Sequence, residues 1–134
     1  MTMVDTSVVV AGFGTWHEHH PHAHRVLAGR PNVSEHVLLE TYATLTGLPP
    51  PHRAPASVVH EFLRRQFRRD PRRLTRTGIS ELLAATAQLG IVGGAVYDAA
   101  IGLAAKQVGE RLITLDRRAV RTYRLLEVDH DVLT

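Results

Sequence analysis

Residues 93–116 read Gly-Gly-Ala-Val-Tyr-Asp-Ala-Ala-Ile-Gly-Leu-Ala-Ala-Lys-Gln-Val-Gly-Glu-Arg-Leu-Ile-Thr-Leu-Asp. The small and apolar residues after Gly94 predict a helix from about Ala95 to Val108. Gly109 ends this helix, because glycine is the residue most often found just past a helix. The apolar run that follows predicts a strand from Arg111 to Leu115. A helix that leads directly into a buried strand is a building unit of α/β domains.

The rest of the chain repeats this alternation. Met3 and Val4 predict the start of a buried parallel strand, and Val8 to Ala11 either extend it or begin a short helix, since periodicity does not decide between the two. Further strands are predicted at Leu74–Thr77 and Leu126–Val132. Helices are predicted at about 23–27, 34–47, 56–69, 80–89 and 117–123. The sequence therefore predicts an α/β fold with a mainly parallel sheet, in a single domain over residues 1–134.

The composition excludes several kinds of protein. The chain has no cysteine, which excludes disulfides, zinc–thiolate sites and thiol catalysis. Its apolar stretches are far shorter than a membrane span, and Asp5 interrupts the N-terminal apolar run, so neither a membrane segment nor a signal peptide is expected. We therefore expect a cytoplasmic protein. The formal net charge is +3, and a basic surface suits a polyanionic partner.

Four acidic residues lie at or near apolar segments, where a lone charge is rare: Asp5, Glu40, Asp98 and Asp116. Asp5 and Asp116 each follow a predicted strand, and Asp98 lies in the first turn of its helix. Because sites in parallel sheets form at the carboxyl ends of the strands, these three carboxylates are expected to meet at one edge of the sheet. Glu40 joins them if its helix leans over that edge. A hard cation such as Mg²⁺ or Mn²⁺ is the partner that an all-oxygen set prefers.

These residues, in this order, resemble the PIN-domain family, and more closely its toxin branch, the VapC ribonucleases of toxin–antitoxin pairs. The family has a strand that ends in Asp followed by Ser or Thr, which is matched here by Val4-Asp5-Thr6-Ser7. It has a helical Glu after an apolar run, matched by Glu40, and an Asp that opens a helix of small residues, matched by Tyr97-Asp98-Ala99-Ala100. Its last motif, Thr-x-Asp at the end of a strand, is matched by Thr114-Leu115-Asp116.

The resemblance implies a PIN-like three-layer α/β/α domain and a Mg²⁺- or Mn²⁺-dependent endoribonuclease that inhibits translation or growth. It also implies a homodimeric toxin inhibited by a cognate VapB-type antitoxin. Asp5 and Asp98 are then the expected direct metal ligands, Asp116 binds directly or through water, and Glu40 binds a second ion or orients the attacking water. The hydroxyls of Thr6 and Thr114 are expected to hydrogen-bond the ligand carboxylates. The alternative is a PIN-like regulator that binds RNA or its antitoxin with little or no cleavage.

Two further groups of residues lie outside the shared pattern. The first is a histidine-rich stretch, which we interpret as an exposed loop leading into a helix, although a His-rich metal-binding protein remains an alternative. It consists of His17, His19, His20, His22 and His24. The second is a basic run expected on one side of a helix, either as a solvated face or as a contact for RNA or an acidic antitoxin. It consists of Arg64, Arg65, Arg68 and Arg69.

Overall fold

The computed structural model describes residues 1–133 of the chain. Three strands and seven helices are present in the described residues, and six of the helices lie between β1 and β2, so the predicted alternation of strands and helices is only partial. The elements are β1 (Thr2–Val4), α1 (Thr6–Phe13), α2 (His20–Ala28), α3 (Glu35–Gly47), α4 (Ala56–Gln66), α5 (Arg76–Leu89), α6 (Ala95–Gln107), β2 (Arg111–Thr114), α7 (Ala119–Leu125) and β3 (His130–Val132).

The sheet is parallel throughout. β1 pairs with β2, where Val4 lies opposite Ile113, and β2 pairs with β3 on its other side. Two single bridges continue the sheet beyond β1, from Met3 to Asn32 and from Ser34 to Arg72. The predicted parallel sheet is therefore confirmed.

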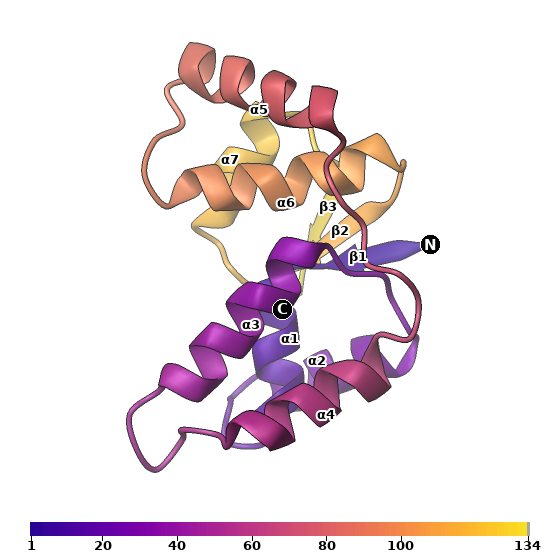
Figure 1. Cartoon of the computed structure of the whole chain (residues 1–134), viewed down its shortest axis with the longest axis vertical. Helices are drawn as coiled ribbons and strands as arrows, with labels where there is room; N and C mark the ends of the chain where they lie inside the picture. The colour runs from indigo at the N-terminus through magenta and orange to yellow at the C-terminus, as the bar shows by residue number, and fades with distance from the viewer. Residues whose placement is uncertain (134) are drawn as a thin grey trace.

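The sheet lies between two layers of helices, as the α/β/α prediction requires. In Figure 1, α1 to α4 lie on the lower side of the strands and α5 to α7 on the upper side. Right-handed crossovers explain this division. The chain moves from β1 outward in one direction through α1–α4, and then returns past β1 to β2 and β3 through α5–α7. Both faces of the sheet are therefore covered, and Met3, Val4 and Leu112 are fully buried.

A glycine on α6 sets how closely α7 approaches it. A Cβ atom at Gly102 would lie 3.0 Å from Val128 Cγ2 and 3.1 Å from Tyr123 Cδ1, so a larger residue would push α7 away. Tyr123 is the largest fully buried side chain among the residues described. The close contact between α6 and α7 matters for function because it brings Tyr123 of α7 to Asp5, which directly follows β1, as described below.

The structure corrects several predicted boundaries. The segment Val8–Ala11 is helical, because Asp5 caps α1 directly after β1. The predicted strand at Leu74–Thr77 is wrong: Thr75 caps α5 by accepting a hydrogen bond from Gly78 N, so that helix begins before Ser80. The predicted helix 56–69 ends at Gln66.

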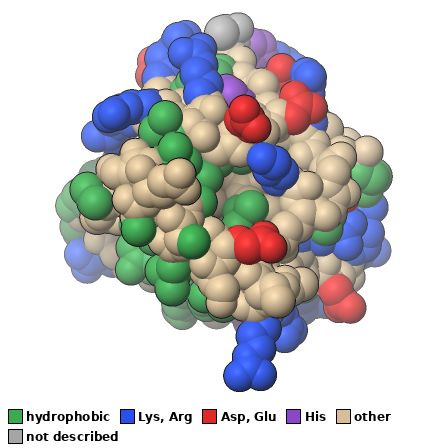
Figure 2. Space-filling view, turned by 90° about the horizontal axis from the view of Figure 1, so that it is seen from above, with side chains coloured by type: hydrophobic (Ala, Val, Ile, Leu, Met, Phe, Trp, Pro, Cys, Tyr) green, Lys and Arg blue, Asp and Glu red, His purple; other side chains and the backbone are tan. Residues whose placement is uncertain are grey.

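The surface is basic at its edges and apolar in places. Figure 2 looks down on the layer that contains α5 to α7, with Lys and Arg side chains around the rim and hydrophobic side chains gathered on one side. On α5, Ile79 and Leu83 are half exposed and lie one helical turn apart. Leu39 on α3 is also exposed. Within residues 1–133, no helix is both long enough and apolar enough to cross a membrane.

Candidate active site

Asp5 is a buried carboxylate that is held at both oxygens. It follows β1, is 3% exposed, and caps α1 by accepting a hydrogen bond at Oδ1 from Ser7 N (3.1 Å). The Ser7 hydroxyl donates to the same oxygen. Tyr123 donates its hydroxyl proton to Oδ2 at 2.9 Å. These donors fix the orientation of the Asp5 carboxylate before any ligand arrives.

Burial and hydrogen bonding act in opposite directions on Asp5. Burial raises the pKa of Asp5, because a charge is costly in a low dielectric, whereas the hydroxyls of Ser7, Thr114 and Tyr123 lower it. Burial and the nearby Asp5 charge also raise the pKa of Tyr123. Tyr123 therefore stays protonated and serves as a permanent donor to Asp5.

A hydroxyl network joins the ends of β1 and β2. Ser7 Oγ accepts a hydrogen bond from Leu115 N (2.8 Å) and lies 3.4 Å from Thr114 Oγ1. Thr114 Oγ1 accepts from Asp116 N at 3.0 Å. Ser7 and Thr114 thus hold the two loops that carry Asp5 and Asp116 at a fixed separation.

Thr6 does not have the predicted role. Its hydroxyl oxygen is buried without a hydrogen-bond partner among the residues described. The residue that contacts Asp5 is its neighbour Ser7, because the second residue of α1 is the one whose amide and hydroxyl both point back to the capping carboxylate. The hydroxyl of Thr114 orders the backbone of Asp116 and lowers the pKa of Asp5, and its role beside a metal ligand stays a prediction.

Asp98 shows that the four acids interact. It is half-buried in the first turn of α6. Burial, followed by repulsion from Asp116, Asp5 and Glu40, raises the pKa of Asp98 to about 6, while His36 acts in the opposite direction. Carboxylates that lie close together raise one another's pKa in this way.

Glu40 and Asp116 complete the group from two other directions. His36 Nε2 lies 3.3 Å from Glu40 Oε2, one helical turn away on α3, and the His36 ring stacks on Tyr97 with centroids 5.0 Å apart. Asp116 Oδ1 accepts a hydrogen bond from Arg118 N at 2.9 Å. His36 was missed at the sequence level, although its spacing four residues before Glu40 was the available signal.

All four acids line one cavity of about 580 Å³, between α1, α3, α6 and the end of β2. The expectation that the acids meet at the carboxyl edge of the sheet, and that α3 brings Glu40 to it, is consistent with this shared wall. Among residues 1–133, no three His, Asp or Glu side chains converge tightly enough to coordinate one ion by themselves. The volume of the cavity, about 580 Å³, leaves room for water between its carboxylates.

The histidine-rich stretch is more structured than an exposed loop. His17 and His19 line the same cavity as the acids, and His19 N donates to His17 Nδ1 at 3.1 Å. His20 is the first residue of α2, and its Nδ1 lies 2.8 Å from Ala11 O. His22 and His24 are exposed, as predicted. Part of this stretch thus forms a wall of the acidic cavity.

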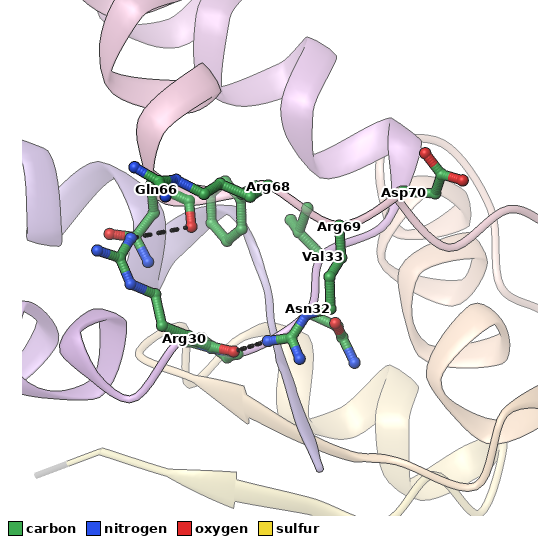
Figure 3. A pocket seen from close by; sticks show the side chains of 9 residues that line it. Arg30, Asn32, Val33, Gln66, Arg68, Arg69 and Asp70 are labelled. Carbon is green, nitrogen blue, oxygen red and sulfur yellow. Dashed lines mark hydrogen bonds between the residues drawn. The ribbon is translucent and has the colours of Figure 1, made fainter.

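The basic run does not form one face of a helix. Arg64 and Arg65 lie in the last turn of α4 and both pair with Glu61, at 2.8 and 2.6 Å. Arg68 and Arg69 follow the end of α4 and line a second cavity on the opposite edge of the sheet, shown in Figure 3. The i, i+4 spacing suggested a single face because the sequence gives no clear stop before Pro71.

Comparison with known proteins places the chain in a family. The PIN domain family matches residues 2–125, and the chain belongs to that family. It is 42% identical over all 134 residues to Ribonuclease VapC40 of Mycobacterium tuberculosis H37Rv, and the match covers 100% of both chains. It is 36% identical over 130 residues to Ribonuclease VapC27 of the same strain, covering 93% of this chain and 91% of the relative.

Solved structures agree on the fold. FitAcB from Neisseria gonorrhoeae superposes with a TM-score of 0.71 at 16% identity, covering 97% of this chain and 96% of the other. VapBC2 from Rickettsia felis, bound to a DNA fragment from its promoter, superposes with a TM-score of 0.67 at 14% identity, covering 99% and 98%. At these identities, the likeness supports the three-layer PIN fold alone.

Proposed function

We propose that this protein is the toxin of a toxin–antitoxin pair and acts as a metal-dependent endoribonuclease. The observation that carries the proposal is the cavity lined by Asp5, Glu40, Asp98 and Asp116, in which burial and then repulsion from the other three acids raise the pKa of Asp98. The names of the VapC relatives, at 42% and 36% identity, support ribonuclease activity. The proposal treats residues 1–134 as one PIN domain.

The donor set fits Mg²⁺ or Mn²⁺. It consists of carboxylate oxygens, and the mutual repulsion that Asp98 experiences is the kind that a divalent cation offsets. Asp5 and Asp98 would bind the ion directly, Asp116 directly or through water, and Glu40 a second ion or the attacking water. Mg²⁺ commonly keeps several water ligands, which agrees with a cavity whose acids are spread around its wall. Such an ion, when bound, makes water more acidic and shields the charge that develops on the phosphate.

The chain's own residues would position the reactants. Ser7 and Tyr123 fix both oxygens of Asp5, which prevents this carboxylate from turning away. His36 restrains Glu40 at the cavity wall. Arg118 lines the cavity beside Asp116, where its guanidinium can contact a bound phosphodiester.

We further propose two protein partners. The solved neighbours are named as VapBC2 and FitAcB, and a cognate VapB-type antitoxin would place a basic side chain into the acidic cavity. A homodimer would cover exposed apolar side chains, for which Leu39, Ile79 and Leu83 are the candidates. Size-exclusion chromatography with light scattering, on the wild type and on Leu83→Glu, tests the second point, since a protein that is monomeric throughout contradicts it.

The activity is tested with purified protein and a mixed single-stranded RNA. We expect cleavage with Mg²⁺ or Mn²⁺ and none in excess EDTA. Asp98→Asn should lose cleavage, whereas Asp129→Asn should keep it, because Asp129 is an exposed acid that pairs with Arg111. Cleavage that persists in chelator would contradict the metal mechanism. RNA binding without cleavage, with every metal, would instead favour the regulator.

A further inference from the structure

A second cavity, of about 360 Å³, lies away from the four acids, at the end of the sheet where the parallel strands begin. We call this end the amino edge and the opposite end, where the strands finish, the carboxyl edge. It forms where the turn after α2 meets the segment that follows α4. Its lining includes the apolar side chains of Val33 and Phe67 and the guanidinium-bearing residues Arg30, Arg68 and Arg69. In Figure 3, Arg30 and Arg69 border the cavity from two sides, Arg68 extends above it, and the Asp70 carboxylate points away.

Backbone carbonyls hold this cavity in shape. Arg30 Nη1 donates to Arg65 O at 3.1 Å, and Gln66 Nε2 donates to Leu27 O at 2.7 Å. Arg69 Nη2 donates to Arg30 O. A carbonyl oxygen fixes a guanidinium without neutralising it, so the positive charge of Arg30 and Arg69 remains available to a ligand.

The arginines that line the cavity differ from the surrounding arginines, because the surrounding ones form ion pairs with acidic side chains. Arg64 and Arg65 pair with Glu61, Arg72 pairs with Glu110, and Arg73 pairs with Glu35. Over residues 1–133, no carboxylate oxygen lies within 4.0 Å of a guanidinium nitrogen of the three that line the cavity. These three are Arg30, Arg68 and Arg69.

We propose that this arginine pocket binds a phosphate group, and that the phosphate belongs to the RNA strand whose scissile bond lies in the acidic cavity. The second half of the proposal rests on the ribonuclease function. Guanidinium groups match phosphate oxygens in pairs, and the volume accommodates a phosphate with its sugar against the Val33 and Phe67 surface. Arg68 is the principal contact, because it makes no hydrogen bond within residues 1–133 that binding would have to break.

The position of the pocket separates its role from the chemistry. Asp5 and Asp116 follow the carboxyl ends of β1 and β2, whereas Arg30 lies before Asn32, the residue that forms the bridge with Met3, and so lies toward the amino ends of the strands. A phosphate held there positions the strand and contributes equally to the ground and transition states. Loss of the contact should therefore weaken RNA binding and leave the cleavage step unchanged.

The test compares Arg68→Gln with Arg64→Gln, which removes the same charge but from an arginine already paired with Glu61. Binding of an uncleavable 2′-O-methyl RNA, without metal, is measured at several salt concentrations. Arg68→Gln should weaken binding about fivefold and reduce the log–log salt slope by about 0.7, the value for one phosphate contact on a single strand. Arg64→Gln should change neither, and single-turnover cleavage at saturating enzyme should be the same for both.

A second measurement tests the chemistry of the pocket without RNA. Inorganic phosphate and adenosine 5′-monophosphate are titrated while the Nε–H resonances of the arginine side chains are followed by NMR. Shifts of Arg68 and Arg69, but not Arg64, support a phosphate site. If these shifts occur and RNA affinity is unaffected by Arg68→Gln, the site takes small phosphate compounds and the assignment to RNA is overturned. No shift with phosphate, or shifts only with an acidic glutamate peptide, overturns the site altogether.

The two proposals fail in different ways. If the wild type does not cut RNA with any metal but Arg68 still responds to phosphate, the nuclease function is wrong and the phosphate site stands. If the wild type cuts RNA and Arg68→Gln binds it with the affinity and salt slope of Arg64→Gln, the pocket is only part of the scaffold.

Discussion

The two edges of the sheet carry opposite charge, and the direction of the chain explains why. At the carboxyl edge, Asp5 caps α1 and Asp98 lies in the first turn of α6, where unpaired N–H groups favour negative charge. At the amino edge, α2 and α4 end, and Arg30 donates to the last carbonyls of α4. In a parallel α/β fold, helices begin at one edge and end at the other, so the backbone itself favours acids on one side and arginines on the other.

The edges also differ in how their charges are compensated. At the carboxyl edge, burial and then repulsion from the neighbouring acids raise the pKa of Asp98 to about 6. At the amino edge, Glu110 is buried and accepts hydrogen bonds from Asn32 (2.8 Å) and Arg72 (2.9 Å). The amino edge is thus expected to stabilise the fold, and the carboxyl edge to reduce its stability until a cation binds.

The largest expected effect is on catalysis at the carboxyl edge. Asp5→Asn should reduce single-turnover RNA cleavage on the order of 10³-fold or more, because Asn retains the shape of the side chain but removes the charge that holds the cation. The hydrogen bond from Ser7 N can still be accepted, so circular dichroism should show a folded protein. Cleavage near the wild-type rate would mean that Asp5 is not a metal ligand.

The next effect is on stability at the amino edge. Glu110→Ala should lower the free energy of unfolding by about 3 kcal/mol, since it leaves the Asn32 amide and the Arg72 guanidinium without their shared acceptor. Urea unfolding measures this. The matched control is Glu35→Ala, which removes an exposed partner of Arg73 and should cost less than about 1 kcal/mol. Equal losses in the two variants would contradict the contrast between the edges.

A smaller effect tests the restraint on Asp5. Tyr123→Phe removes only the hydroxyl that donates to Asp5 Oδ2 and should weaken Mn²⁺ affinity or activity about 10- to 100-fold. Tyr42→Phe, on the exposed face of α3, is the control and should have no effect. Isothermal titration with Mn²⁺ and single-turnover cleavage are the measurements. A wild-type affinity for Mn²⁺ would show that Ser7 alone orients Asp5.

The smallest effect is a pH-dependent gain in stability. The folded state raises the pKa of Asp98 from its ordinary value near 3.8 to about 6, so it holds a proton more tightly than the unfolded chain does. Stability therefore falls as pH rises from about 4 to about 6 and stays reduced above that. After allowance for its half-exposed position, Asp98→Asn should raise the melting temperature without metal by about 3 °C at pH 8 and by about half as much at pH 5, the middle of the titration range.

Differential scanning calorimetry in EDTA checks this pH dependence, with Asp129→Asn as the control because that acid is exposed and paired with Arg111. A gain that is the same at pH 5 and pH 8 would show that Asp98 is not the group that titrates.

The positions of helices and strands that depend on neighbouring residues were predicted from the sequence. Contacts between residues far apart in the chain were not. The helix 95–107 and the strand 111–114 were predicted because small and apolar residues follow one another between glycines. Thr75 and Ser80 are both competent N-caps, and local sequence does not rank them; the hydrogen bond to Gly78 N decides for Thr75. Tyr123 could not be assigned to Asp5, since the two are 118 positions apart and meet only because Gly102 admits α7.

Thr6 was predicted to hydrogen-bond a ligand carboxylate, and the contact that Ser7 makes with Asp5 was missed for a related reason. Both hydroxyls follow Asp5, and the family pattern accepts either residue type. What distinguishes the two hydroxyls is their direction. The second residue of α1, Ser7, faces the loop after β2, where its Oγ accepts a hydrogen bond from Leu115 N. The arginine pocket was missed because α4 ends at Gln66, which moves Arg68 and Arg69 off the helix.

Trp16 provides an optical probe next to a residue that lines the acidic cavity. It is the single tryptophan of the chain, and its ring packs 4.4 Å from that of His52 and 5.8 Å from that of His17, which lines the cavity. Gly14 leaves room for the indole, since a Cβ there would lie 2.8 Å from it. Tryptophan fluorescence of the unmodified protein therefore comes from one position, next to the cavity-lining His17, and it offers a label-free optical signal for the arrival of metal, RNA or an inhibitor.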